Sequence, residues 1–124
     1  MAKNEASKNI EDFLNFVKES EERYKMAGAD LEQTHNETQD ILHRLELYDV
    51  GHHEAAACAK KLKSVRRRRR TAKDTMEELE PIVRWAYENR AGIGQIQRVL
   101  GEVRKEEQRH ENRFYLPKTK ILEE

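Results

Sequence analysis

The hydrophobic positions of this chain recur in alternating steps of three and four residues, through two long segments and a shorter third one. The first series, which includes a few polar members, is Ile10, Leu14, Val17, Glu21, Tyr24, Gly28, Leu31, His35, Thr38, Leu42 and Leu45. The second is Cys58, Leu62, Val65, Arg69, Ala72, Met76, Leu79, Val83 and Ala86, and the third is Ile93, Ile96, Leu100 and Val103. An average spacing of about 3.5 residues keeps one side of a helix facing a partner helix. The pattern therefore predicts an all-α fold of long helices that pack as in a coiled coil.

Turn and capping residues divide this pattern into three expected helices, at about residues 7–47, 52–89 and 93–113, with an extended tail at 114–124, all in a single domain of residues 1–124. Ser7 or Asn9 is expected to cap the first helix with its side-chain oxygen. The sequence LYDVG at residues 47–51 predicts the turn that follows. Pro81 removes an amide donor, so it either kinks the second helix or begins a new one. The sequence AGIG, with two glycines, predicts the break before the third helix.

A turn near residues 49–51 makes the first two helices a long antiparallel hairpin, with Leu42 opposite Cys58 and Gly28 opposite Ala72. Only 36% of the 124 residues are hydrophobic and 39% are charged, so the chain can bury narrow stripes between helices and no thick core. We therefore expect the third helix to pack along the distal half of the hairpin. A second copy of the chain is expected to cover the remaining open side, in a homodimer or a higher oligomer.

Nine cations and no acid lie between residues 60 and 73 of the second expected helix: Lys60, Lys61, Lys63, Arg66, Arg67, Arg68, Arg69, Arg70 and Lys73. Such a density of positive charge is typical of a surface that binds phosphate groups or an acidic protein. The candidate binding residues are Lys63, Arg66, Arg67, Arg68, Arg70 and Lys73. The chain has no net charge, and no aromatic residues are interleaved with the arginines, which favours a protein partner over a nucleic acid.

The same run has a purely structural interpretation. In the expected hairpin it lies opposite residues 27–40, which contain Asp30, Glu32, Glu37 and Asp40 and no lysine or arginine. Part of the run can therefore form a ladder of salt bridges that sets the register of the two helices. Nine cations against four acids would still leave about five for a partner. The sequence leaves both interpretations open.

Trp85, Phe114 and Tyr115 are candidate interface anchors, because exposed aromatic side chains commonly anchor protein interfaces. Trp85 can equally pack beneath the third helix as ordinary core. The two tail aromatics lie outside any helical period, which favours docking on a neighbouring protomer or another partner.

No motif in the sequence indicates catalysis or a cofactor. A Gly-rich phosphate loop, a nucleophile elbow and a paired-carboxylate pattern are all missing, so we expect no enzyme activity. The histidines at 43, 52 and 53 and Cys58 lack the spacing of a metal site, and no metal or other cofactor is expected. No stretch approaches the roughly 20 apolar residues of a membrane helix. Acidic residues precede any apolar run at the N-terminus, unlike in a secretory signal, and with a single cysteine the features predict a cytoplasmic protein.

Four segments resemble small helical proteins encoded by phages and prophages of Gram-positive bacteria. They are LHRLEL at 42–47, the arginine block that ends in TAKD at 71–74, LEPIV at 79–83 and NRFYLP at 112–117, and the resemblance covers about residues 38–118. It implies an accessory protein in the host-cell cytoplasm that binds a host or phage macromolecule, for example one that inhibits host defence. We therefore expect a non-enzymatic helical interaction protein that presents its arginine face to a protein partner. The alternative hypothesis is a nucleic-acid-binding protein that uses the same arginines on phosphates.

Overall fold

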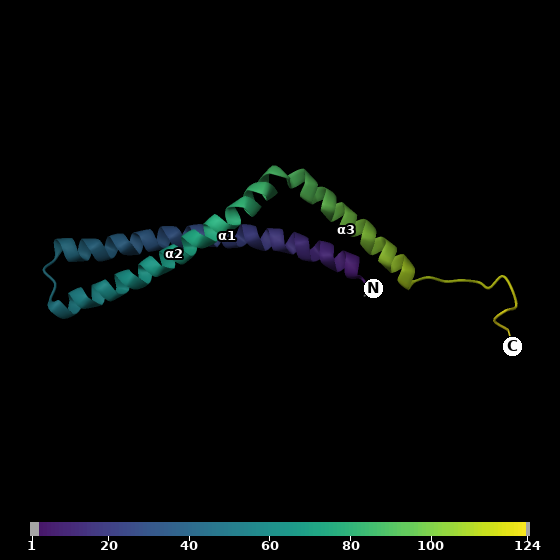
Figure 1. Cartoon of the computed structure of the whole chain (residues 1–124), viewed down its shortest axis with the longest axis horizontal. Helices are drawn as coiled ribbons and strands as arrows, with labels where there is room; N and C mark the ends of the chain where they lie inside the picture. The colour runs from purple at the N-terminus through teal and green to yellow at the C-terminus, as the bar shows by residue number, and fades with distance from the viewer. Residues whose placement is uncertain (1–2, 124) are drawn as a thin grey trace. The chain divides into compact units, whose positions relative to one another are not determined.

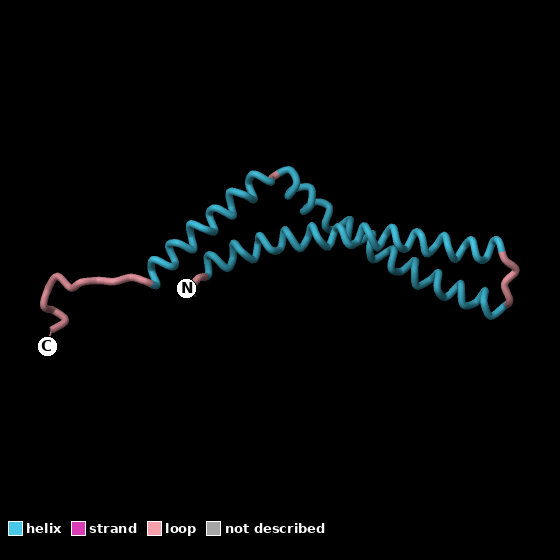
Figure 2. Tube along the Cα trace, turned by 180° about the vertical axis from the view of Figure 1, so that it is seen from behind, coloured by secondary structure: helices cyan, strands magenta, loops and turns pink. Residues whose placement is uncertain are grey.

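The computed structural model describes residues 3–123, and within that range it contains three α-helices and no strand (Figures 1 and 2). Helix α1 spans Glu5–Leu47, α2 spans His52–Glu88 and α3 spans Arg90–Glu111. The prediction of an all-α fold is confirmed. None of the helices in residues 3–123 combines the length and the apolar character needed to cross a membrane.

The chain forms two compact units. The hairpin unit is Phe16–Asn89, and the terminal unit combines Met1–Asn15 with Arg90–Glu124. Helix α1 contributes to both units, because its first turns belong to the terminal unit and the rest belongs to the hairpin unit.

In the hairpin unit, α1 and α2 lie side by side in antiparallel directions, joined by a loop that ends in Gly51 (Figure 1). Gly51 caps α2, because its carbonyl accepts a hydrogen bond of 2.9 Å from the amide of Ala55. Arg44 Nε donates a hydrogen bond of 2.7 Å to Glu54 Oε1 across the loop. This bond and the charge of the carboxylate raise the pKa of the Arg44 guanidinium, which also stacks 4.7 Å from the ring centroid of Tyr48. A charged pair between the end of α1 and the start of α2 therefore closes the loop.

The interface between α1 and α2 is narrow and built largely from small residues. In α2 the buried residues recur at every seventh position, as the sequence predicts: Cys58, Val65, Ala72, Leu79 and Ala86. On α1 two of the most buried side chains are hydroxyls, Ser20 at 1% exposure and Thr34 at 0%. Ser20 Oγ donates to the carbonyl of Phe16 (2.7 Å) and Thr34 Oγ1 to that of Leu31 (3.0 Å). A hydroxyl whose hydrogen bond is made within its own helix can be buried without losing a partner.

The stripe that α1 turns toward α2 differs by one residue from the predicted one at several positions. His35 and Leu42 are exposed, whereas their neighbours Thr34 and Ile41 are buried and half-buried. The prediction extended a rhythm set by the apolar members of the series, and so it placed His35 and Leu42 in the interface. The structure places Thr34 there instead of His35, because its hydroxyl is already hydrogen-bonded within its own helix.

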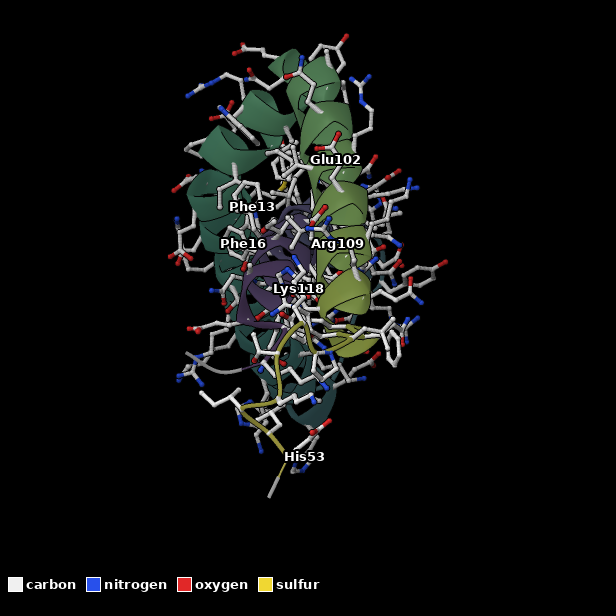
Figure 3. The ribbon with its side chains drawn as sticks, turned by 90° about the vertical axis from the view of Figure 1, so that its right-hand side faces the viewer. Phe13, Phe16, His53, Glu102, Arg109 and Lys118 are labelled. Atoms are coloured by element: carbon white, nitrogen blue, oxygen red, sulfur yellow. The ribbon has the colours of Figure 1, made fainter. Side chains whose placement is uncertain are left out.

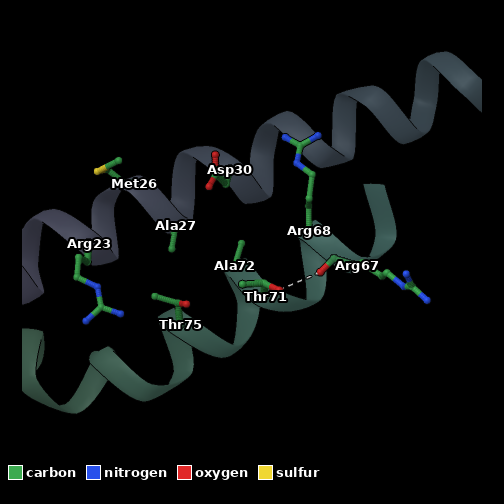
Figure 4. Close-up of a pocket in the computed structure, with 9 residues that line it drawn as sticks. All are labelled: Arg23, Met26, Ala27, Asp30, Arg67, Arg68, Thr71, Ala72 and Thr75. Carbon is green, nitrogen blue, oxygen red and sulfur yellow. Dashed lines mark hydrogen bonds between the residues drawn. The ribbon is translucent and has the colours of Figure 1, made fainter. Parts of the chain in front are cut away.

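The expected pairing of Gly28 with Ala72 is also wrong by one residue. Ala27 is the residue that points toward Ala72, and both alanines are buried (Figure 4). Gly28 lies beside Met76 instead, whose Cε is 3.7 Å from the position that a Cβ at Gly28 would take.

The helix ends differ from the predicted ones for local reasons. Helix α1 begins before Ser7, and Ser7 is no cap: it lies inside the helix, where its Oγ donates a hydrogen bond of 3.0 Å to the carbonyl of Asn4. Asn4, at a φ of 61°, precedes the helix in the left-handed region that asparagine tolerates. Helix α2 continues through Pro81 as one helix, so Pro81 does not begin a new one.

The break between α2 and α3 falls at Asn89, earlier than the glycines that were expected to make it. The side-chain amide of Asn89 donates a hydrogen bond of 2.8 Å to the carbonyl of Trp85, and its backbone amide donates to that of Ala86. A short polar side chain that bonds the last carbonyls ends a helix in this way. Gly92 and Gly94 lie inside α3 and cost it about 1 kcal/mol each relative to alanine.

In the terminal unit, α3 runs antiparallel to the first turns of α1, in keeping with the predicted packing of the third helix. Arg104 Nη2 lies 2.8 Å from Glu11 Oε2, and Lys3 Nζ lies 3.4 Å from Glu111 Oε1. Leu100 is the buried residue of α3. From the end of α3 to residue 123 the structure contains no further helix, and residues 112–123 are exposed throughout.

Candidate functional site

The nine cations of residues 60–73 all lie in the middle of α2, where only the side chains of Arg69 and Lys73 are half-buried and the others are exposed. This segment contains no glycine or proline, and arginine and lysine are good helix formers. The run is therefore presented by a continuous, rigid helix. Its members point in several directions, so the surface has to be considered face by face.

Two members of the run form ion pairs. Arg68 Nη1 lies 2.7 Å from Glu37 Oε2 on α1, and Arg70 Nη1 lies 3.5 Å from Asp74 Oδ1 one turn further along α2. The other seven make no ion pair with any residue between 3 and 123. Of the predicted ladder, only the contact with Glu37 is present in that part of the chain. The structural interpretation therefore accounts for one interhelical ion pair and leaves most of the cations of the run without an acidic partner in that part of the chain.

One face of α2 combines four of these cations with an apolar strip, in a shallow groove of about 470 Å³ that we call the basic groove. It is lined by Ala59, Leu62, Lys63, Arg66, Arg67 and Arg70. The spacing of these six residues places them in one stripe along the helix surface. Four of the six predicted binding residues thus meet in one place.

A second hollow, of about 420 Å³, lies between α1 and α2 within the hairpin unit (Figure 4). Its lining residues are Arg23, Met26, Ala27, Asp30, Arg67, Arg68, Thr71, Ala72 and Thr75. Arg23 and Arg68 each reach from one helix toward the other, and Thr71 Oγ1 donates to the carbonyl of Arg67 at 3.2 Å (Figure 4). The guanidinium of Arg68 is already paired with Glu37, and the side chain of Arg67 points away from the hollow (Figure 4). The remaining Arg23 and Asp30 offer no pair of groups for nucleophilic or acid–base chemistry.

The histidines and the cysteine do not converge. The rings of His52 and His53 lie edge to face, with centroids 6.1 Å apart, and Cys58 is buried in the helix interface. Within residues 3–123 no group of three or more histidine, cysteine, aspartate or glutamate side chains is placed to hold a metal ion.

The three predicted aromatic anchors have different environments. Trp85, near the end of α2, keeps 41% of its surface exposed. Phe114 and Tyr115 lie in the extended segment after α3 and are 81% and 67% exposed. The structure therefore separates the tail aromatics, which are largely free of helix packing, from Trp85, which is half covered.

The cations of the basic groove were predictable from the sequence, whereas its apolar strip was not predicted. Leu62 was assigned wholly to the helix interface because it fits the seven-residue rhythm, yet it is half-buried and borders the groove as well. The signal that could have found it is the spacing of Leu62 and Ala59 from Lys63, Arg66 and Arg70, which sets all of them on one face of a helix. Arg23 was missed because it comes from the other helix.

Comparison of the chain with protein-family models, with curated proteins and with solved structures finds no significant match in any of the three.

Proposed function

We propose that this protein is a non-enzymatic interaction protein that binds an acidic surface of a partner protein through the basic groove of α2. The observation that carries the proposal is the arrangement of Lys63, Arg66 and Arg67 around Leu62, with none of the three cations paired to an acid in residues 3–123. The resemblance to phage proteins adds that the partner is a host or phage protein in the host-cell cytoplasm.

The chemistry of the groove favours an amphipathic acidic helix as the partner element. Leucine side chains of such a helix would cover Ala59 and Leu62, while its carboxylates would reach the guanidiniums of Arg66 and Arg67. Guanidinium–carboxylate hydrogen bonds are stronger than neutral ones and are directional, which suits recognition of a defined surface.

A nucleic acid is the competing partner for the same arginines. No aromatic side chain lines the basic groove or the neighbouring hollow, so neither offers a platform on which bases could stack. The apolar strip at Leu62 has no use in contacts with phosphates alone, and it favours a protein.

The test is a titration of the full chain against four labelled probes, followed by fluorescence anisotropy at low and physiological salt. The probes are a helical peptide of about 20 residues with leucine on one face and glutamate on the other, a polyglutamate of equal charge, duplex DNA and single-stranded RNA. We expect the amphipathic peptide to bind most tightly, because only it satisfies both the apolar strip and the cations.

Matched variants distinguish the groove from the general charge of the helix. The variant R66Q/R67Q removes two groove cations, and K60Q/K61Q removes two exposed cations of the same helix that do not line the groove. We expect R66Q/R67Q to weaken peptide binding by at least about tenfold and K60Q/K61Q by less than about twofold. Equal losses in the two variants would refute the groove, and tighter binding of DNA or RNA than of the peptide would replace the protein partner by a nucleic acid.

A further inference from the structure

The terminal unit carries a second groove, of opposite charge to the basic groove and of about 430 Å³. We call it the acidic groove; it lies between the start of α1, which contributes Glu5 and Ala6, and one face of α3. The residues from α3 are Glu102, Val103, Glu106 and Glu107. Glu106 is paired with Arg109 at 2.7 Å. The other three glutamates make no ion pair with any residue from 3 to 123. Carboxylates around Ala6 and Val103 would suit a ligand that is both cationic and apolar.

The tail, residues 112–123, has that chemistry. It carries three cations, Arg113, Lys118 and Lys120, against one acid, Glu123. Between them lie five exposed apolar side chains: Phe114, Tyr115, Leu116, Ile121 and Leu122. The hydrogen bonds recorded for the tail are local, such as that from the amide of Arg113 to the carbonyl of His110. An apolar cluster of this size without a cover is typical of a segment that docks elsewhere.

The tail and the acidic groove also match in length. Residues 113–117 are in no helix or turn, and a chain of five residues in extended form covers roughly 16 Å. The groove runs along α3 from Glu102 to His110, a helical rise of roughly 12 Å. Pro117, which lacks an amide and keeps the preceding residue extended, helps to hold this segment straight.

We propose that the tail of one copy of the chain docks in the acidic groove of a second copy, and that the exchange is reciprocal. In a two-fold dimer each chain supplies one tail and one groove, so the contact is made twice. Within a single chain the tail leaves the end of α3 with its side chains exposed and does not fill the groove (Figure 3 shows Glu102 and Arg109 on α3 and Lys118 on the tail). In the dimer, the tail of the second copy would fill the acidic groove of the first, and the groove of the second copy would cover the exposed tail of the first. This contact does not involve the basic groove. The dimer proposal can therefore hold even if the proposed partner of α2 is incorrect.

Charge reversal provides a sharp test by sedimentation velocity of the full chain. The groove variant is E102K/E107K, which spares the paired Glu106, and the tail variant is R113E/K118E. All four residues are exposed or half-buried, and none of them forms an ion pair within residues 3–123. We expect the wild type to be a dimer and each variant alone to be a monomer, because like charges then face each other in both contacts.

The two variants mixed in equal amounts should form a heterodimer, because reversed grooves then meet reversed tails and native grooves meet native tails. The chain that carries all four substitutions should be a homodimer again. A wild type that stays monomeric up to about 100 µM would overturn the proposal. Variants that remain dimeric alone would overturn it as well, as would a mixture that forms no heterodimer.

The aromatic part of the contact has its own matched control. F114A/Y115A removes two tail aromatics, whereas Y87A removes an aromatic side chain of similar exposure, 77%, from α2. We expect F114A/Y115A to raise the dimer dissociation constant by at least about tenfold and Y87A to leave it unchanged. An equal effect of the two variants would refute the docking of the tail aromatics.

Discussion

Replacing Ala72 by leucine tests how closely α1 and α2 approach each other. Ala72 is 5% exposed and points toward Ala27, which is 6% exposed, on the opposite helix (Figure 4). Two facing alanines let the helices approach closely, so the additional carbon atoms of a leucine would have to turn into the neighbouring hollow or push the helices apart. Either response requires a strained rotamer or displaces the neighbouring side chains.

Overpacking of this kind costs about 1–3 kcal/mol, from a total stability of about 5–15 kcal/mol for a typical domain. For a unit of roughly 60–100 residues, each kcal/mol lowers the midpoint of thermal unfolding by about 4–8 °C. We therefore expect A72L to lower Tm by roughly 4–24 °C in a melt followed by circular dichroism at 222 nm.

The control is A56L, which makes the same substitution at an exposed position of the same helix. Alanine and leucine differ in helix propensity by only about a few tenths of a kcal/mol, so A56L should shift Tm by no more than about 2 °C. If A72L shifts Tm no further than A56L does, the two helices are not in close contact at this layer. The description of the interface as one of small residues would then be wrong.

Three further substitutions test other parts of the structure in the same melts. Gly28→Ala should stabilise the chain by about 1 kcal/mol, because alanine has the higher helix propensity and its methyl would lie in ordinary contact with Met76, 3.7 Å away. A loss of stability would show that the backbone at this position cannot accept a side chain. Arg68→Gln should cost about 0.2–1 kcal/mol, because its 2.7 Å pair with Glu37 is only partly shielded from water, and a larger loss would revive the ladder as a source of stability. Leu100→Ala should cost about 2 kcal/mol and speed hydrogen exchange in α3, whereas unchanged exchange would mean that α3 is held by its ion pairs instead.

The rhythm of α2 was predictable because its buried positions are apolar and recur without exception at every seventh residue. That of α1 was predictable only in part, since the interface there accepts Ser20 and Thr34 at its most buried points. Both hydroxyls return their hydrogen bonds to their own helix, and this local solution has no signature in a pattern of apolar residues. The predicted stripe on α1 is therefore displaced by one residue, so the close contact with Ala72 was expected at Gly28 and is made by Ala27.

The candidate site, too, was predictable only in part. The cations of the basic groove follow from composition, but which of them have partners depends on the angular position of each side chain around α2. Arg68 turns toward Glu37, while Arg66 and Arg67 do not meet an acid in the described part of the chain. Five consecutive arginines contain no information about this choice, because the register of α1 decides it.

The zero net charge of the chain is a weak argument against binding by electrostatic attraction. At physiological ionic strength the Debye length is about 8 Å, so a partner at the basic groove responds to the charges near Leu62 and hardly at all to the sum over the molecule. In that region Lys63, Arg66 and Arg67 form no ion pair within residues 3–123, and neither do Glu102 and Glu107 in the acidic groove. Two grooves of opposite sign cancel in the total and act separately on their partners. Salt should therefore weaken both peptide binding in the basic groove and tail docking in the acidic groove, and each independently of the other. A substitution that abolishes peptide binding should leave the salt dependence of tail docking unchanged, and a substitution that abolishes tail docking should leave that of peptide binding unchanged.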